Sequence, residues 1–105
     1  EYKEVTMTYV DVLKALADEK RLQIMCLLMQ GTKCVCEIEP ALEISQSSTS
    51  KHLIKLKQAG LIQSTKRGQS VHYYIPEHVF IRYPFVAQLI QEVSEQSAHH
   101  KERME

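Results

Sequence analysis

Apolar residues recur at the spacing of amphipathic helices in three long segments of the chain. The first segment runs from Tyr9 to Ala17, and the second runs from Leu22 to Leu28, with Gly31 marking its end. A third segment extends from Phe85 to Ser97. We predict a helix over each segment and place the second at the centre of the core, because apolar residues surround it almost completely. Residues 1–8 are polar, and we expect them to be loose.

A further helix, called the reading helix below, is predicted over residues 46–59. Thr49, Leu53 and Leu56 form an apolar stripe with the four- and three-residue steps of a core-facing surface. Ser45 can cap the first turn with its hydroxyl, and Gly60 can end the helix in the left-handed conformation. The opposite face offers short hydroxyls, an imidazole and two ammonium groups, on Ser48, Lys51, His52 and Lys55. These groups suit phosphates and base edges, although an ordinary solvated helix has the same pattern.

A shorter helix, over residues 37–43, precedes the reading helix and contains a proline. Because proline is tolerated only in the first turn of a helix, Pro40 places the helix start near Glu37 to Glu39. Cys34 to Cys36 would then lie at or before that start. A turn of two to three residues joins this helix to the reading helix, which predicts a helix-turn-helix.

Two segments after the reading helix are predicted to pair as a β-hairpin. Leu61 to Thr65 and Ser70 to Ile75 flank the tip Lys66-Arg67-Gly68-Gln69, and apolar and polar residues alternate in the second segment. This hairpin would form a wing over residues 62–75. The predicted fold is therefore mainly α with one β-hairpin wing, a winged helix-turn-helix, and we assign residues 1–105 to this single domain.

Chain length and composition limit the function classes. With 105 residues, 44% of them hydrophobic, the core is modest for one domain, so we expect a partner chain to add stability. No apolar run approaches the about 18 residues needed to cross a bilayer, and we expect a cytoplasmic protein without membrane contact. Three cysteines do not make a disulfide framework, so reduced thiols with a metal-binding or redox role are expected.

Charge is distributed unevenly along the chain. The 13 basic residues balance the 13 acidic ones, yet no acidic residue lies between Glu43 and Glu77. The cations of that stretch are Lys51, Lys55, Lys57, Lys66 and Arg67. A positive surface on a neutral protein indicates a polyanion partner, and we predict double-stranded DNA.

Four stretches carry a resemblance to a known family: Leu16-Ala-Asp-Glu-Lys-Arg-Leu-Gln-Ile-Met25, Cys34-Val-Cys-Glu-Ile38, Ser45-Gln-Ser-Ser-Thr-Ser-Lys-His-Leu-Ile-Lys-Leu-Lys-Gln-Ala-Gly-Leu61 and Arg67-Gly-Gln-Ser-Val-His-Tyr-Tyr74. In this order and spacing they resemble the arsenical-repressor (ArsR/SmtB) family of bacterial and archaeal regulators. The resemblance implies a homodimer built from the first and last helices, which represses from an inverted-repeat operator and leaves it when an inducer binds. The expected DNA contacts are Gln46, Ser47, Ser48, Lys51, His52, Lys55, Lys66, Arg67 and Gln69.

Cys34-Val35-Cys36 looks like the thiolate inducer motif of that family. Two thiolates favour soft ions such as trivalent arsenic, cadmium or lead, and no permanent cofactor is expected. Residues i and i+2 of a helix point about 200° apart, so both sulfurs could hold one ion only if this turn were not helical. The familiar arsenic pattern has a third cysteine where this chain has Glu39. Cys26 is either a third ligand or a core residue.

Other readings of the two cysteines stay open. They could form a dithiol redox switch, or be small buried apolar residues. A different class, a small dithiol reductase, is opposed by the absence of a thioredoxin-like alternation of strands and helices. The sequence leaves open the inducer, the choice between ligation and oxidation, and the operator.

Overall fold

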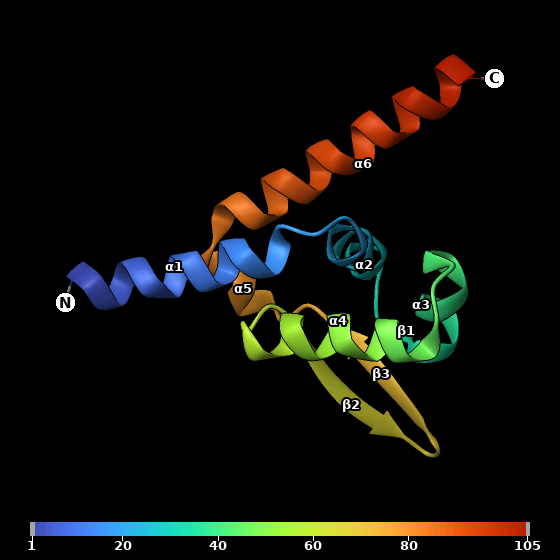
Figure 1. Ribbon diagram of the computed structural model, residues 1–105, viewed down its shortest axis with the longest axis horizontal. Helices are drawn as coiled ribbons and strands as arrows, with labels where there is room; N and C mark the ends of the chain where they lie inside the picture. Colours follow the sequence, from blue (N-terminus) through green and yellow to red (C-terminus); the bar gives the residue numbers. More distant parts are fainter. Residues whose placement is uncertain (1, 105) are drawn as a thin grey trace.

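The computed structural model describes residues 2–104, and it describes the side-chain surroundings of residues 2–98. Its elements, in chain order, are α1 (Tyr2–Leu16), α2 (Glu19–Met29), β1 (Lys33–Cys34), α3 (Val35–Leu42), α4 (Gln46–Gln58), β2 (Gln63–Arg67), β3 (Ser70–Tyr74), α5 (Glu77–Arg82) and α6 (Pro84–Met104). Figure 1 shows α1 and α6 extending from a body formed by the other elements. Among the described residues, no helix combines the length and the apolar character that crossing a lipid bilayer requires.

The core is centred on α2, which packs against α1, α3, α4 and α6. Ile24 and Met25 are completely buried in it, whereas Met29 at the helix end is exposed. Asp18 caps the helix, because its carboxylate accepts hydrogen bonds from the backbone N–H groups of Lys20 and Arg21 at 2.8 and 3.1 Å. The predicted central position of this helix is confirmed.

The reading helix α4 ends at Gln58, one residue before the predicted end. The Ser45 hydroxyl accepts a hydrogen bond from the backbone N–H of Ser48 at 3.1 Å, which satisfies an unpaired first-turn amide. Its inner stripe consists of Thr49, Leu53 and Leu56, all buried. The buried Thr49 hydroxyl donates to the Ser45 carbonyl at 2.9 Å, so its burial leaves no polar atom unpaired.

The expectation that residues 1–8 are loose is wrong for residues 2–8, because α1 begins at Tyr2, and Glu1 lies outside the described residues. The hydroxyls of Thr6 and Thr8 donate to the carbonyls of Tyr2 and Glu4, at 2.8 and 3.1 Å, so polar residues here support the helix. The exposed large apolar residues of α1 are Tyr2, Val5, Met7, Tyr9 and Leu13. A single protomer therefore leaves an apolar surface on this helix in contact with water.

The wing belongs to a three-stranded antiparallel sheet with strand order β1-β3-β2. The prediction placed Lys66 and Arg67 at the hairpin tip, but both lie in β2, and the turn consists of Gly68 and Gln69. Gly68 has φ +62°, the left-handed conformation that such two-residue turns require. Strand β1 was not predicted, since it contains only two residues, and it pairs with β3.

Helix α3 begins earlier than predicted, at Val35, and Pro40 is the sixth residue of the helix instead of a first-turn residue. The early start is stabilised because the Glu37 carboxylate accepts a hydrogen bond from the Cys34 N–H at 3.0 Å. Pro40 has no N–H, so the carbonyl of Cys36 has no helical donor four residues ahead. The helix ends at Leu42 and is followed by the C-cap residue Glu43, whose φ of +56° is left-handed.

Candidate nucleic-acid interface and thiol site

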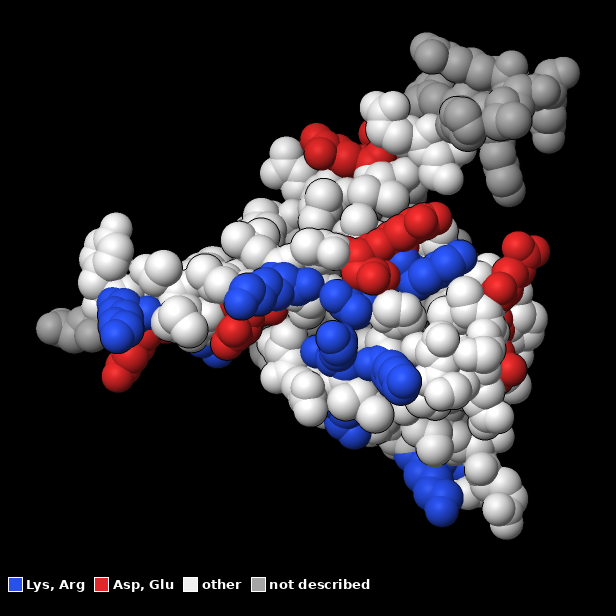
Figure 2. Space-filling view, in the orientation of Figure 1, with Lys and Arg blue, Asp and Glu red and all other residues white. Residues whose placement is uncertain are grey.

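The predicted DNA contacts of the reading helix lie on its outer face. Gln46, Ser47, Lys51 and Lys55 are exposed, whereas Ser48 is half-buried, and its hydroxyl accepts a hydrogen bond from the Ser45 hydroxyl at 3.0 Å. Figure 2 shows lysine and arginine side chains over α4 and along the hairpin, with no acidic side chain over the hairpin. The structure therefore presents a cationic face formed by α4 and the hairpin.

The wing is attached directly to the reading helix. The Lys57 ammonium donates to the Ser64 hydroxyl at 2.7 Å, which joins the last turn of α4 to β2. Lys66, Arg67 and Gln69, the predicted wing contacts, are all exposed beyond this attachment. The outer face of α4 and the hairpin can consequently meet one polyanion together.

His52 is less free than the sequence suggested, because α2 holds one side of its ring. The Arg21 guanidinium lies 3.1 Å from His52 Nδ1 and also donates to the carbonyls of Ala15 and Lys14 at the end of α1. Asp18 lies 3.8 Å from the same ring nitrogen. Arg21 therefore joins α1, α2 and α4 at the base of the cationic face.

Asp18 links the stability of this junction to pH. Partial burial raises the pKa of the Asp18 carboxyl, but the hydrogen bond from the Arg21 backbone N–H and the charge of Arg21 outweigh it, so the pKa lies below its ordinary value of 3.8. A carboxyl with a lowered folded-state pKa stabilises the fold above its ordinary pKa. That contribution disappears as the pH falls through the folded-state value.

We expect Asp18→Ala to lower the free energy of unfolding by about 1 kcal/mol near neutral pH, since the helix cap is lost. Denaturant unfolding of both proteins between about pH 7 and pH 3 measures the effect. The difference between the variant and the wild-type chain should shrink below about pH 4. A difference that stays constant down to pH 3 would contradict the assignment of the cap to the Asp18 carboxylate.

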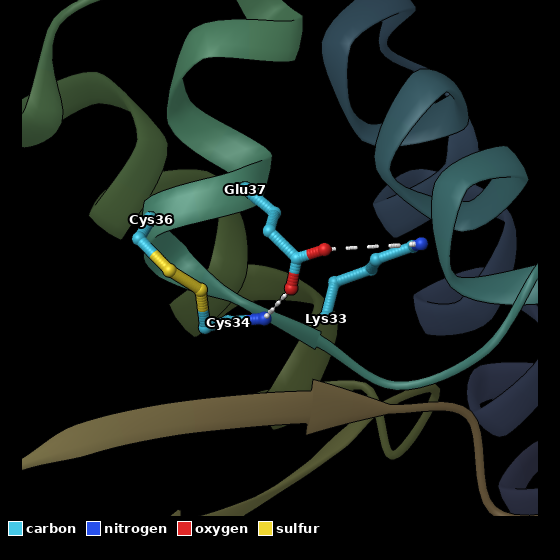
Figure 3. The surroundings of a disulfide bond; sticks show 4 residues. All are labelled: Lys33, Cys34, Cys36 and Glu37. Atoms are coloured by element: carbon cyan, nitrogen blue, oxygen red, sulfur yellow. Dashed lines mark hydrogen bonds and ion pairs between the residues drawn. A yellow bond between two sulfur atoms is a disulfide. The ribbon is translucent and has the colours of Figure 1, made fainter.

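The thiol site lies where β1 meets α3, and Figure 3 shows Cys34 and Cys36 joined by a disulfide bond. The sequence predicted reduced thiols, and this expectation is not met in the structure. The sequence also predicted that the two sulfurs could meet only if the turn were not helical. The structure agrees with that condition at Cys34, which is the extended N-cap residue (φ −81°, ψ +161°) before α3, while Cys36 lies in the first turn. Their Cα atoms are 5.1 Å apart.

The two sulfurs differ in accessibility. Cys34 is 4% exposed beneath the sheet, whereas Cys36 is exposed at the surface of α3. An incoming reagent would therefore meet the Cys36 sulfur first. Cys34 is buried in β1, the strand that pairs with β3 of the wing.

A third donor lies beside the cysteines, and it is Glu37. Among the described residues, Cys34, Cys36 and Glu37 are the one group of three whose ligand atoms all lie within 4.8 Å of one another. Glu39, which occupies the position of the third cysteine of the arsenic pattern, is outside this group. The Glu37 carboxylate is also 4.0 Å from the Lys33 ammonium. A protein ligand set at this place would combine two sulfurs with one carboxylate.

Cys26 is not brought to the other cysteines. It lies half-buried on α2, packed against the core, and lines a cavity of about 620 Å³ between α2 and α6. Its neighbours across the cavity are Val93 and Ser97. This position matches the reading of Cys26 as a packing residue.

The sheet connects the thiol site to the wing. Lys33 pairs with Tyr73 and Cys34 pairs with His72, so β1 lies along the inner strand of the hairpin. Strand β3 in turn pairs with β2, which carries Lys66 and Arg67. One strand therefore separates the backbone of Cys34 from the cations of the wing.

Three residues that shape these sites were missed from the sequence. Glu37 could have been found, because a glutamate three residues after an N-cap position is the sequence signature of a capping box. Arg21 and Asp18 could not, since their contacts with His52 join positions about thirty residues apart.

The comparisons with known proteins agree with this geometry. A family model described as "Bacterial regulatory protein, arsR family" matches residues 18–64. The transcriptional activator HlyU of Vibrio cholerae is 45% identical over 64 residues, which are 61% of this chain and 59% of HlyU. The arsenical resistance operon repressor of Escherichia coli is 42% identical over 71 residues, 67% of this chain and 61% of the repressor. The matches thus span about three fifths of these two relatives.

Solved structures extend the likeness to nearly the whole fold. Reduced HlyU from Vibrio cholerae superposes with a TM-score of 0.73 at 33% identity, covering 90% of this chain and 94% of HlyU. The homodimeric winged helix-turn-helix DNA-binding domain Mb0332 from Mycobacterium bovis has a TM-score of 0.74 at 30% identity. The match covers 97% of this chain and 89% of Mb0332. The predicted winged helix-turn-helix is confirmed, and the relatives are regulators instead of enzymes, which removes the dithiol reductase. The chain belongs to the arsR family of bacterial transcriptional regulators.

Proposed function

We propose that this chain is a homodimeric repressor that binds an inverted-repeat operator and leaves it when the chemistry of Cys34 and Cys36 changes. The observation that carries the proposal is the position of the two sulfurs, on a strand that pairs with the wing and at the start of the helix before the reading helix. Residues 1–105 act as the single domain that contains both the DNA surface and the sensor. The protein works in the cytoplasm, where DNA is accessible.

DNA binding is supported by the cationic face. The outer residues of α4 have the size and hydrogen-bonding groups to read base edges in the major groove, where a helix fits. The exposed Lys66, Arg67 and Gln69 lie on the hairpin, which reaches the neighbouring phosphates or the minor groove. Specific contacts would come from Gln46, Ser47, Ser48, Lys51, His52 and Lys55.

Dimerisation is supported by the exposed apolar residues of α1. Tyr9 packs on Tyr83 and Phe85 at ring-centroid distances of 5.5 and 6.2 Å, so α1 and the start of α6 form one continuous surface. Leu13 is 52% exposed on the same helix. A second copy would cover this surface and place two reading helices about one turn of DNA apart.

We therefore expect the purified chain to sediment at micromolar concentration as a particle of twice its 12.2 kDa mass. Leu13→Glu should shift it toward the monomer, because a dimer would bury the introduced charge. Ser70→Glu is the control, because Ser70 is exposed on β3 and lies on neither α1 nor α6. A wild-type chain that sediments as a monomer would refute this arrangement.

The wing contact is tested through its salt dependence. Replacing Lys66 by Ala removes one phosphate contact in each protomer, so log K against log salt should become shallower by about 0.9 for each lost contact. The loss of affinity should be similar on all sequences, because phosphate contacts carry no base information. Fluorescence anisotropy at several salt concentrations measures both quantities, with Lys3→Ala as the control. An unchanged slope would exclude Lys66 as a DNA contact.

The inducer is proposed to be a soft metal or metalloid ion held by the reduced cysteines. Two thiolates select thiophilic ions, and Glu37 lies within reach as a third donor. A carboxylate is a poor ligand for trivalent arsenic, so this donor set suits cadmium or lead better, whereas trivalent arsenic would use the two sulfurs. Glu37 Oε1 accepts the hydrogen bond from the Cys34 N–H, so ligation would use Oε2, which is 4.0 Å from the Lys33 ammonium.

A second inducer chemistry is favoured by the disulfide itself. Two thiols that can join without unwinding α3 can be oxidised by a peroxide, losing two protons and two electrons while the peroxide is reduced to water. The exposed Cys36 would react first, and the buried Cys34 would close the bond. Both chemistries act on the same two sulfurs.

Ion binding and oxidation can both affect the DNA-binding surface through the backbone of Cys34. Cys34 is at once the N-cap of α3 and the partner of His72 in β3, so a shift of its backbone moves both the helix before α4 and the inner strand of the wing. Because the operator requires α4 and the wing to be placed together, a small relative displacement weakens binding at both contacts.

The deciding experiment is a titration of the reduced protein on a duplex that the wild-type chain has selected from a random-sequence pool. Arsenite, cadmium, lead, zinc and hydrogen peroxide are added separately while anisotropy reports bound DNA. We expect release by at least one thiophilic ion or by peroxide, and no release by zinc at equal concentration. Failure to select any duplex would overturn the DNA-binding role, and release by none of the reagents would overturn the sensor.

A further inference from the structure

His52 occupies the middle of the reading helix, yet a second helix holds one of its ring nitrogens. The imidazole is 20% exposed, and its Nδ1 lies 3.1 Å from the Arg21 guanidinium of α2. The Arg21 side chain is itself 11% exposed and fixed by the carbonyls of Ala15 and Lys14. The position of the guanidinium is therefore set by α1 and α2, independently of DNA.

The chemistry of this contact determines the proton on the ring. A guanidinium has five N–H donors and no acceptor, so a hydrogen bond at this distance requires Nδ1 to present its lone pair. A proton on Nδ1 would place two donors against each other. The Asp18 carboxylate, 3.8 Å from Nδ1, is too far to accept a hydrogen bond from that proton. The neutral ring must then carry its proton on Nε2.

We propose that Arg21 is a positioning residue that makes His52 a hydrogen-bond donor toward DNA through Nε2–H. Such a group can meet guanine O6 or N7, adenine N7, thymine O4 or a phosphate oxygen. It cannot accept a hydrogen bond from the amino group of cytosine or adenine. With a base atom as the acceptor, His52 is a specificity-determining residue, whereas a phosphate acceptor makes it a positioning contact. Either role rests on the proposed binding of α4 to DNA.

The hydrogen bond between Arg21 and His52 has a spectroscopic signature. In protein labelled with ¹⁵N-histidine at about pH 8, where a free imidazole is neutral, the His52 signals should show a protonated Nε2 and an unprotonated Nδ1. The His52→Gln variant identifies these signals by their loss. Arg21→Met should shift the Nδ1 resonance, because its hydrogen bond is removed. Lys20→Met is the matched control, since Lys20 donates to the Leu42 carbonyl and does not touch the ring.

Two substitutions separate the roles of the ring nitrogens in DNA binding and leave Arg21 intact. In His52→Asn, the amide oxygen can replace Nδ1 as the acceptor for Arg21, but nothing replaces Nε2. In His52→Gln, the longer side chain carries an N–H donor to the region of Nε2. We expect Asn to bind the selected duplex about ten-fold more weakly than the wild-type chain, and Gln to stay within about three-fold.

A comparison on an unrelated duplex identifies the acceptor. A base contact predicts that the Asn variant loses affinity only on the selected sequence, whereas a phosphate contact predicts an equal loss on both. The inference is overturned if Nδ1 carries the proton, if Arg21→Met leaves its resonance unchanged, or if the Asn variant binds the selected duplex as tightly as the Gln variant. If the wild-type chain selects no duplex, the proposed function itself fails, while the spectra still decide the hydrogen bond between Arg21 and His52.

Discussion

Serine at position 34 or 36 should leave operator binding nearly unchanged and remove the response to the inducer. Serine keeps the approximate size of cysteine and lacks the soft, ionisable sulfur, and neither cysteine lies on α4 or the hairpin. Release from DNA depends on that sulfur. A shift from mostly bound to mostly released requires a coupling of about 5 kcal/mol, which one thiol and one hydroxyl cannot supply. Anisotropy titrations of Cys34→Ser and Cys36→Ser with each inducer measure both effects.

Cys26→Ser is the matched control for this prediction. Cys26 packs against the core on α2, so its replacement should cost some stability and retain induction. Loss of induction in Cys26→Ser, with DNA binding intact, would instead make Cys26 part of the sensor. Normal induction in either of the single variants at 34 or 36 would show that one sulfur is sufficient.

Replacing Lys51 and Lys55 together by alanine should reduce operator affinity at least about a hundred-fold. Both side chains are exposed on the outer face of α4, and a dimer would lose four contacts, each worth about 1–3 kcal/mol if it reaches a base. The fold should not change, because the inner stripe of the helix is untouched. Circular dichroism and unfolding midpoints verify this point.

Lys3 and Lys20 offer a matched double variant for the same measurement. Both are lysines of the helices, and neither lies on α4 or the hairpin. Lys3→Ala, Lys20→Ala should bind DNA within a few-fold of the wild-type chain. An equal loss in both double variants would mean that net charge, and not the face formed by α4 and the hairpin, determines affinity.

Periodicity was sufficient to predict the helices and strands in which apolar residues recur at a regular spacing. Thr49, Leu53 and Leu56 were assigned to the buried face of α4 because three- and four-residue steps return to one side of a helix. The hairpin followed from two-residue alternation around Gly68. In both cases the local pattern and the tertiary packing demand the same arrangement.

The errors arose where the structure depends on a single hydrogen bond or a distant partner. The start of α3 predicted from Pro40 was too late. The Glu37 carboxylate accepts a hydrogen bond from the Cys34 N–H, and this bond stabilises an earlier helix start at Val35. Strand β1 has two residues and exists only because β3, almost forty residues later, pairs with it. Residues 2–8 were predicted to be loose because many of their side chains are polar. The helix there leaves its apolar residues exposed, so no buried apolar stripe marks it in the sequence.

The cysteines were predicted to be the chemically reactive pair of the chain, and this stays a prediction. Their place beside the helix-turn-helix followed from their position in the chain. Their geometry agrees with the condition that a turn holding both sulfurs together is not fully helical, because Cys34 has extended backbone. As an extended N-cap residue it directs its sulfur back toward Cys36, and a helix start of this kind cannot be located from periodicity alone.

The most direct test of the account uses the Cys34→Ser, Cys36→Ser double variant on the selected duplex. Reduced wild-type protein and the double variant are titrated in parallel with arsenite, cadmium, lead and peroxide, while anisotropy records the fraction of DNA bound. The account predicts release of the duplex from the wild-type chain and continued binding by the double variant at every inducer concentration. Full release from the double variant would contradict it and would place the sensor elsewhere in the chain.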